Sequence, residues 1–155
     1  TRDINRGIIK KPKYFLNLFE ANSTNLNTTQ SLYAYPISGS WVMGGGRLDD
    51  NPLTTEGCSF NFRDGASQST LWRPPITASG GNWFTGSGFE ASASITHKTT
   101  DIRMDVTDIV NKWISGSITN NGFIIKRSGS LGLITTGSND DEGHSKRVGY
   151  LQFFS

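Results

Sequence analysis

Apolar residues in this chain recur mostly in short runs with the two-residue period of a β-strand. The segment 14–19 is almost continuously apolar, and 102–106 alternates strictly, which places Ile102, Met104 and Val106 on one face. Further runs bounded by Gly, Ser, Asn or Pro predict strands at 32–35, 58–62, 122–126, 131–134 and 148–154. About seven short strands with long polar connections predict an all-β fold, an antiparallel jelly-roll-like β-sandwich with long loops.

One segment departs from this period. Its apolar residues have the spacing of one helical face: Val106, Ile109, Val110 and Trp113. Thr107 suits the N-cap and Gly116 suits the stop, so the pattern predicts a short helix over 107–115. We expect its apolar face to pack on the sandwich with Trp113 as the deepest anchor, and Phe123 to continue the core on the next strand.

Composition and charge exclude several classes of protein. Gly, Ser, Thr and Asn make up 64 of the 155 residues, and the chain also has 9 Phe, 4 Trp and 4 Tyr, so neither a helical nor a disordered protein is expected. The net charge of +2 is small, and the basic run 10–13 is typical of a solvated approach to a strand, so we expect no nucleic-acid partner. No apolar stretch is long enough for a membrane span.

Catalytic and metal-binding patterns are absent from the sequence. His97 and His144 lie far apart, and Cys58 falls in an alternating segment that favours a small core residue over a nucleophile. The acidic segments 49–51 and 140–144 contain oxygen ligands of the kind calcium takes, but their spacing matches no calcium loop. We therefore expect no enzyme activity, no cofactor and solvated acidic turns rather than a structural calcium site.

Two long loops contain the candidate contact residues. The loops 39–57 and 64–88 carry three tryptophans, and one of them has a basic neighbour: Trp41, Trp72, Arg73 and Trp83. Exposed indole rings could stack on sugars or dock on a protein partner. The alternative is that each ring anchors its own loop by burying a large apolar area.

A family resemblance covers most of the chain. Residues 101–116 followed by 120–126 resemble the D-V-T-x-x-V-x-x-W-x-x-G … N-x-G-F-x-I signature of DNRLRE-type β-sandwich domains, which are related to carbohydrate-binding modules of the disaggregatase kind. The segments 33–36, 40–41, 46–60 and 149–155 are similar to the version found in virion proteins of T4-like tailed bacteriophages. The resemblance implies a jelly-roll-like structural, decorating or receptor-contacting module in which Val106 and Trp113 are core residues.

Two functions follow as expectations. The first is a non-catalytic structural or interaction module of a tailed-bacteriophage virion, as a decoration, neck, baseplate or fibre component. It would contact other virion proteins, copies of itself or the host surface. The alternative is a carbohydrate-binding module that recognises glycans through its loop aromatics, on a virion or a secreted enzyme. Because the chain begins with Thr1 and ends in an apolar stretch, we expect residues 1–155 to form one domain of a longer polypeptide.

Overall fold

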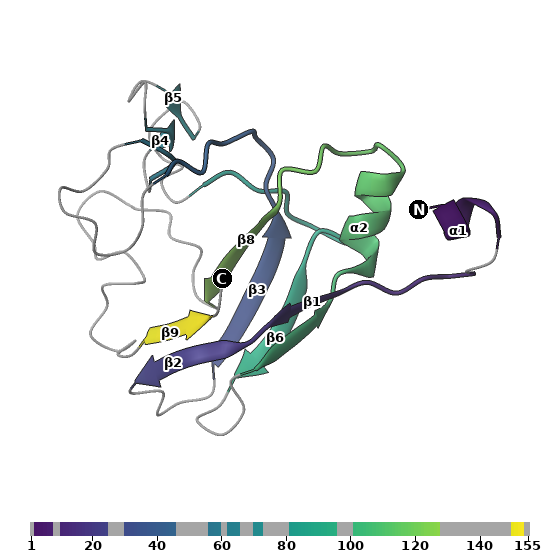
Figure 1. Ribbon diagram of the computed structural model, residues 1–155, viewed down its shortest axis with the longest axis horizontal. Helices are drawn as coiled ribbons and strands as arrows, with labels where there is room; N and C mark the ends of the chain where they lie inside the picture. Colours follow the sequence, from purple (N-terminus) through teal and green to yellow (C-terminus); the bar gives the residue numbers. More distant parts are fainter. Residues whose placement is uncertain are drawn as a thin grey trace.

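The structure is a computed structural model, and the arrangement of its elements is shown in Figure 1. It describes residues 2–7, 10–24, 30–45, 56–59, 62–65, 70–72, 81–95, 101–127 and 150–153. Its elements are α1 (Arg2–Asn5), β1 (Phe15–Leu18), β2 (Glu20–Thr24), β3 (Gln30–Pro36), β4 (Phe62–Asp64), β5 (Thr70–Leu71), β6 (Ala91–Ile95), β7 (Ile102–Asp105), α2 (Thr107–Ile114), β8 (Phe123–Arg127) and β9 (Tyr150–Phe153). The strand pairs among these residues are antiparallel. The predicted all-β fold is therefore confirmed, while the jelly-roll topology stays a prediction.

The strands form small sheets around a three-stranded centre. The order in the largest is β6-β3-β8, and β1 pairs with β7, β2 with β9 and β4 with β5. The strands β1 and β2 follow each other almost without a break but have different partners, as Figure 1 shows. At the junction, the backbone N–H of Glu20 donates to Asp101 Oδ1 at 3.0 Å. This stretch of chain therefore passes from one sheet to another, as strands at the corners of sandwiches do.

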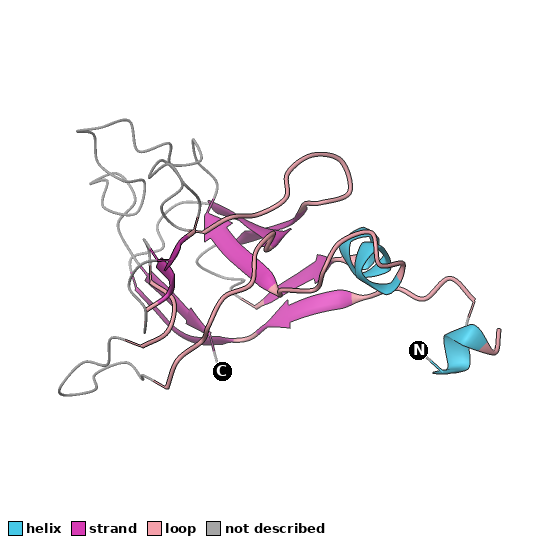
Figure 2. Cartoon of the chain, turned by 90° about the horizontal axis from the view of Figure 1, so that it is seen from above, coloured by secondary structure: helices cyan, strands magenta, loops and turns pink. Residues whose placement is uncertain are grey.

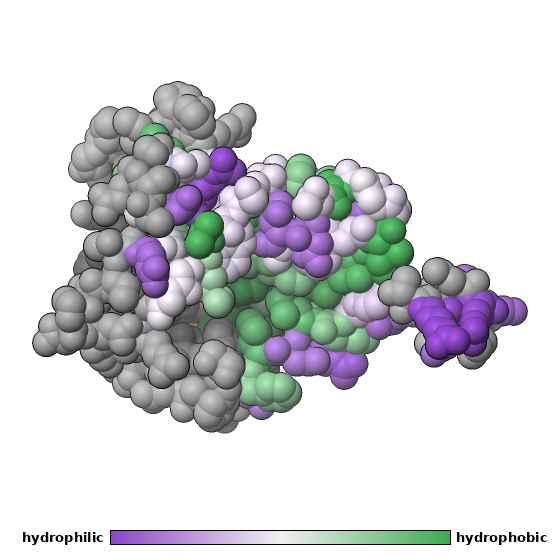
Figure 3. Space-filling model, turned by 45° about the horizontal axis from the view of Figure 1, so that its top comes forward, coloured by the Kyte–Doolittle hydropathy of each residue, from purple (hydrophilic) through white to green (hydrophobic). Residues whose placement is uncertain are grey.

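The core lies where the inner faces of β6-β3-β8 and β1-β7 meet, and Figure 2 shows these strands from above with α2 at one end. Its buried side chains are Leu32, Ala34, Ala91, Ile95, Ile102, Met104 and Val106. Met104 is 0% exposed and Ile95 is 1% exposed. The predicted inward orientation of Ile102, Met104 and Val106 is confirmed. The helix α1 lies apart from the sheets (Figure 1), with Arg2 and Asp3 exposed, and this end of the molecule is hydrophilic where Figure 3 colours it.

The helix α2 is confirmed in place, but two details of the prediction are wrong. Ile109 is the buried residue of α2, at 1% exposed. Trp113 is only partly buried and packs its ring on Phe123 with centroids 4.7 Å apart. The helix stops as predicted at Gly116, which has a φ of +73° and donates its N–H to Trp113 O at 3.1 Å.

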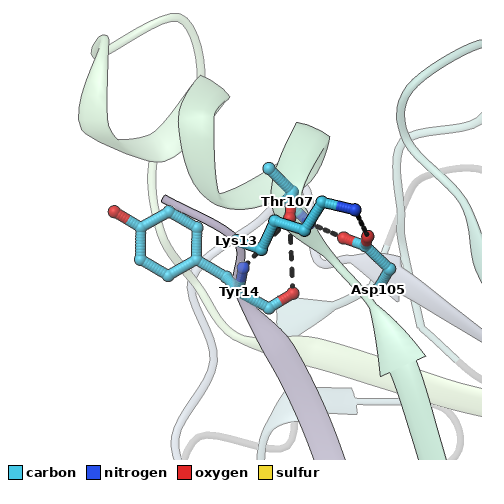
Figure 4. Close-up of polar contacts among 4 residues, drawn as sticks. All are labelled: Lys13, Tyr14, Asp105 and Thr107. Atoms are coloured by element: carbon cyan, nitrogen blue, oxygen red, sulfur yellow. Dashed lines mark hydrogen bonds and ion pairs between the residues drawn. The ribbon is translucent and has the colours of Figure 1, made fainter. Parts of the chain in front are cut away.

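Thr107 is the first helical residue rather than the N-cap, and it ties α2 to β1 (Figure 4). The N–H of Tyr14 donates to Thr107 Oγ1 at 3.0 Å, and the N–H of Val106 donates to Tyr14 O at 2.9 Å. Asp105 Oδ1 accepts the N–H of Thr107 at 3.0 Å, and Lys13 Nζ lies 3.8 Å from Asp105 Oδ2. Hydrogen bonding by Thr107, helped by nearby Lys13, lowers the pKa of Asp105. The Asp105 carboxylate therefore accepts the first N–H of the helix, whereas the sequence predicted that the Thr107 hydroxyl would cap it.

Removing the Thr107 hydroxyl is expected to loosen this junction. Thr107→Ala should lower the free energy of unfolding by about 1 kcal/mol, because the partly buried N–H of Tyr14 loses its acceptor. Thr107→Ser keeps the hydroxyl and should retain most of the stability. Urea unfolding of the three proteins measures the difference. Equal losses in both variants would assign the effect to the methyl group instead.

The predicted strand 58–62 is wrong for its first half. Cys58 and Ser59 lie outside any strand, and β4 begins only at Phe62. Ser59 instead bonds directly to the first residue of β4: its N–H donates to Phe62 O at 2.7 Å, and its Oγ accepts the N–H of Phe62 at 3.2 Å. Local bonds of this kind compete with strand pairing. Cys58 is exposed rather than in the core, and the predicted strand 131–134 lies outside the described residues.

Candidate interaction surface

Three consecutive large apolar residues project from the protein at one loop, and we call residues 41–43 the apolar tip. Trp41 is 37% exposed, Val42 is 47% exposed and Met43 is 79% exposed. Scattered exposed apolar residues are ordinary on a protein surface, but a contiguous set is typical of a contact site. Of the contact residues predicted from the sequence, Trp41 therefore lies in a run of consecutive exposed apolar side chains.

The backbone of the apolar tip is held by long-range hydrogen bonds. Val42 N–H donates to Arg63 O at 3.0 Å, and Cys58 N–H donates to Val42 O at 2.6 Å. The indole N–H of Trp41 donates to Asn121 O at 2.7 Å. The tip is thus fixed to β4 and to the turn before β8, so its side chains are presented from a defined position.

Two glycines let the chain segments beneath the tip touch. Gly44 has a φ of +75°, and a Cβ there would lie 2.6 Å from Glu56 O. Gly57 has a φ of +95°, and a Cβ there would lie 2.5 Å from Met43 O. Both positions need glycine for conformation and for space. Gly57 lies 13 residues beyond Gly44 in the chain, and no local sequence pattern pairs the two.

Trp72 takes the structural role rather than the contact role. It is only 9% exposed, and its indole N–H donates to Ser59 O at 2.7 Å. The side-chain amide of Asn82 donates to Trp72 O. With its ring covered and its N–H used, Trp72 anchors the segments around β4, β5 and residue 82. The predicted neighbour Arg73 lies outside the described residues, as do His97, His144 and the acidic segments 49–51 and 140–144.

Trp83 belongs to a row of aromatic rings on the face of the central sheet opposite Leu32 and Ala34. The Tyr33 and Tyr35 rings stack with centroids 6.1 Å apart, and Trp83 lies 6.2 Å from Tyr35. Lys126 Nζ sits 4.0 Å from the centre of the Trp83 ring. Tyr35 Oη donates to Glu90 Oε2 at 2.9 Å, and burial together with Glu90 raises the pKa of Tyr35 to about 12. Trp83 is therefore packed between neighbours, which favours the anchoring alternative.

Comparison with known proteins adds no relative: no protein-family model, curated protein or solved structure matches this chain. Within the described part of the chain, no helix is long and apolar enough to cross a membrane. In the same residues, no three His, Cys, Asp or Glu side chains gather as metal ligands.

Proposed function

We propose that this chain is a non-catalytic interaction module that binds other macromolecules through its apolar tip, in the role of a structural component of a tailed-bacteriophage virion. The observation that supports it is the exposure of three consecutive apolar side chains, Trp41, Val42 and Met43, on a fixed backbone. The virion setting comes from the family resemblance of the sequence. The partners would be other virion proteins.

The composition and the rigidity of the tip both suit binding. Trp and Met are enriched in the cores of protein interfaces, and burying one large apolar side chain stabilises by about 1.5–3 kcal/mol. Because hydrogen bonds from Trp41, Val42 and Cys58 already hold the loop, binding has little backbone freedom to remove. A pre-organised contact surface keeps more of its gross interaction energy as affinity.

A charge placed at the tip is expected to prevent assembly without unfolding the domain. Met43→Asp should reduce the copy number of this chain in purified virus particles at least tenfold, because a carboxylate would have to be desolvated in the contact. Quantitative mass spectrometry of the particles measures the copy number. Ile114→Asp is the matched control, since Ile114 is also apolar and is 50% exposed, but lies on α2.

Three outcomes decide the proposal. Loss with Met43→Asp and not with Ile114→Asp supports the tip as the contact site, provided both variants unfold at the denaturant concentration of the parent. An unchanged copy number in Met43→Asp contradicts it. Absence of the chain from particles contradicts the virion setting.

Glycan binding is the second candidate, and the partly exposed ring of Trp41 is the observation that favours it. Aromatic ring faces provide apolar contact area with a polar handle. If the same domain is retained on an immobilised glycan and Trp41→Ala abolishes retention, the tip recognises carbohydrate rather than a virion protein.

A further inference from the structure

The outer face of the β1-β7 sheet carries a second group of exposed side chains, away from the apolar tip. On β1 the side chains alternate between exposed and partly buried, so that Leu16 and Leu18 pack against the core while Phe15 and Asn17 face outward. Phe15 is 38% exposed, and Phe19, the next outward residue, is 59% exposed. Two phenylalanines are thus left on the open face of a sheet.

The neighbouring strand β7 places alternating charges on this same face. Arg103 lies opposite Asn17, and Asp105 lies opposite Phe15. Asp101 precedes β7 and, like Arg103 and Asp105, is exposed. Along β7 the outward charges therefore run acidic, basic, acidic.

The charged groups on this face differ in whether they have hydrogen-bond or ion-pair partners. The carboxylates have bonding partners, Glu20 N–H for Asp101 and Thr107 N–H for Asp105. The guanidinium of Arg103 lies 4.0 Å from the centre of the Phe15 ring, and no carboxylate among the described residues is within ion-pair distance of it. A guanidinium that lies over a ring uses none of its five N–H donors in that contact, so they remain available to an acceptor.

We propose that this face, made of Phe15, Asn17, Phe19, Arg103 and Asp105, binds the same face of a second copy of the chain. The charge pattern argues for a copy over an unrelated partner. In this arrangement the β7 strands of the two copies face each other and run antiparallel, related by a two-fold axis level with Met104. Each Arg103 then lies opposite Asp105 of the other copy. The symmetry makes each contact occur twice, as in isologous dimers.

The apolar part of the contact comes from the two phenylalanines. Outward residues two positions apart on a strand lie about 7 Å from each other, so Phe15 and Phe19 are separated by roughly 14 Å and flank Asn17. Aromatic residues and Arg are the types that dominate binding energy at interfaces. Two strands make a small contact area, so the dimer belongs to the weak, reversible class. This surface is independent of the apolar tip.

The test is sedimentation equilibrium of the full chain over a concentration series, in low and high salt. We expect a monomer–dimer equilibrium whose Kd rises at least tenfold in Phe19→Ser and in Arg103→Asp. We also expect the Kd to rise several-fold when NaCl is raised from 0.05 to 0.5 M. The Debye length falls from ~14 Å to ~4 Å over this range, so the added salt screens the ion pairs between the copies. Met43→Asp, at the apolar tip, should leave the Kd unchanged, which separates this proposal from the proposed function.

A distance measurement fixes the geometry. In a Cys58→Ser background, a spin label on Asn17→Cys should give an inter-label distance within about 20 Å, because packed sheets lie about 10 Å apart. A monomer at every concentration overturns the proposal. A dimer that is unaffected by Phe19→Ser and Arg103→Asp, or that gives a long Asn17 distance, also overturns it.

Discussion

Trp72→Ala is expected to lower the free energy of unfolding by about 3–5 kcal/mol, the range for removing a large buried aromatic side chain. Trp72 is 9% exposed and connects two parts of the chain, through its N–H to Ser59 O and its carbonyl to the Asn82 side chain. The variant leaves a cavity and an acceptor without its donor. Chemical denaturation followed by circular dichroism measures the loss.

Two controls show which part of Trp72 matters. Trp72→Phe keeps an aromatic ring but loses the hydrogen bond to Ser59 O, so we expect a smaller loss of about 1–2 kcal/mol. Trp41→Ala removes a tryptophan that is 37% exposed and should cost less than Trp72→Ala. If Trp72→Ala shifts stability by no more than Trp41→Ala, the buried anchor assigned to Trp72 is wrong.

Gly44→Ala is expected to have the second-largest effect, a loss of about 2–5 kcal/mol. A side chain at φ +75° costs about 1–2 kcal/mol, and the new Cβ would also lie 2.6 Å from the backbone oxygen of Glu56. Relieving such a contact by shifting the backbone typically costs a further ~1–3 kcal/mol. The displaced loop carries the apolar tip, so Gly44→Ala should also weaken assembly.

Gly116→Ala is a closely matched control for Gly44→Ala. Gly116 has a φ of +73°, but nothing lies within 4 Å of the added Cβ, so only the conformational cost of about 1–2 kcal/mol applies. The difference between the two variants therefore isolates the close contact with Glu56. Equal losses in a thermal or urea melt would mean that the segments at Gly44 and Gly57 do not touch in solution.

Strongly patterned elements were predictable from neighbouring residues alone. The strict alternation at Ile102 and Met104 and the helical spacing through Ile109 each produced the predicted element. In such segments the hydrophobic period of the sequence places the apolar residues on the face that is buried in the fold. The strands β2 and β6 were missed, because Glu20–Thr24 is largely polar and Ala91–Ile95 alternates two serines with two alanines and one isoleucine. Their strand conformation is set by pairing with β9 and β3.

The surface could be predicted only as a set of candidates. Trp41, Trp72 and Trp83 all lie in Gly-rich or Pro-rich loop sequence, yet one is partly exposed, one is buried and one joins a row of rings. Nothing adjacent to them in the chain distinguishes these environments. Each depends on a distant group: Asn121 O for Trp41, Ser59 O for Trp72, and Tyr35 for Trp83.

The secondary structure of this protein is set largely by neighbouring residues, whereas its surface is set by contacts between distant segments. The all-β fold and the helix at 107–114 follow from hydrophobic period, turn residues and a glycine stop, which act over a few neighbouring residues. The apolar tip, the Gly44–Gly57 contact and the outward face of β1 and β7 arise where segments far apart in sequence meet. Burial and exposure of a side chain depend on those meetings, because they decide which apolar surface is covered and which is left for a partner.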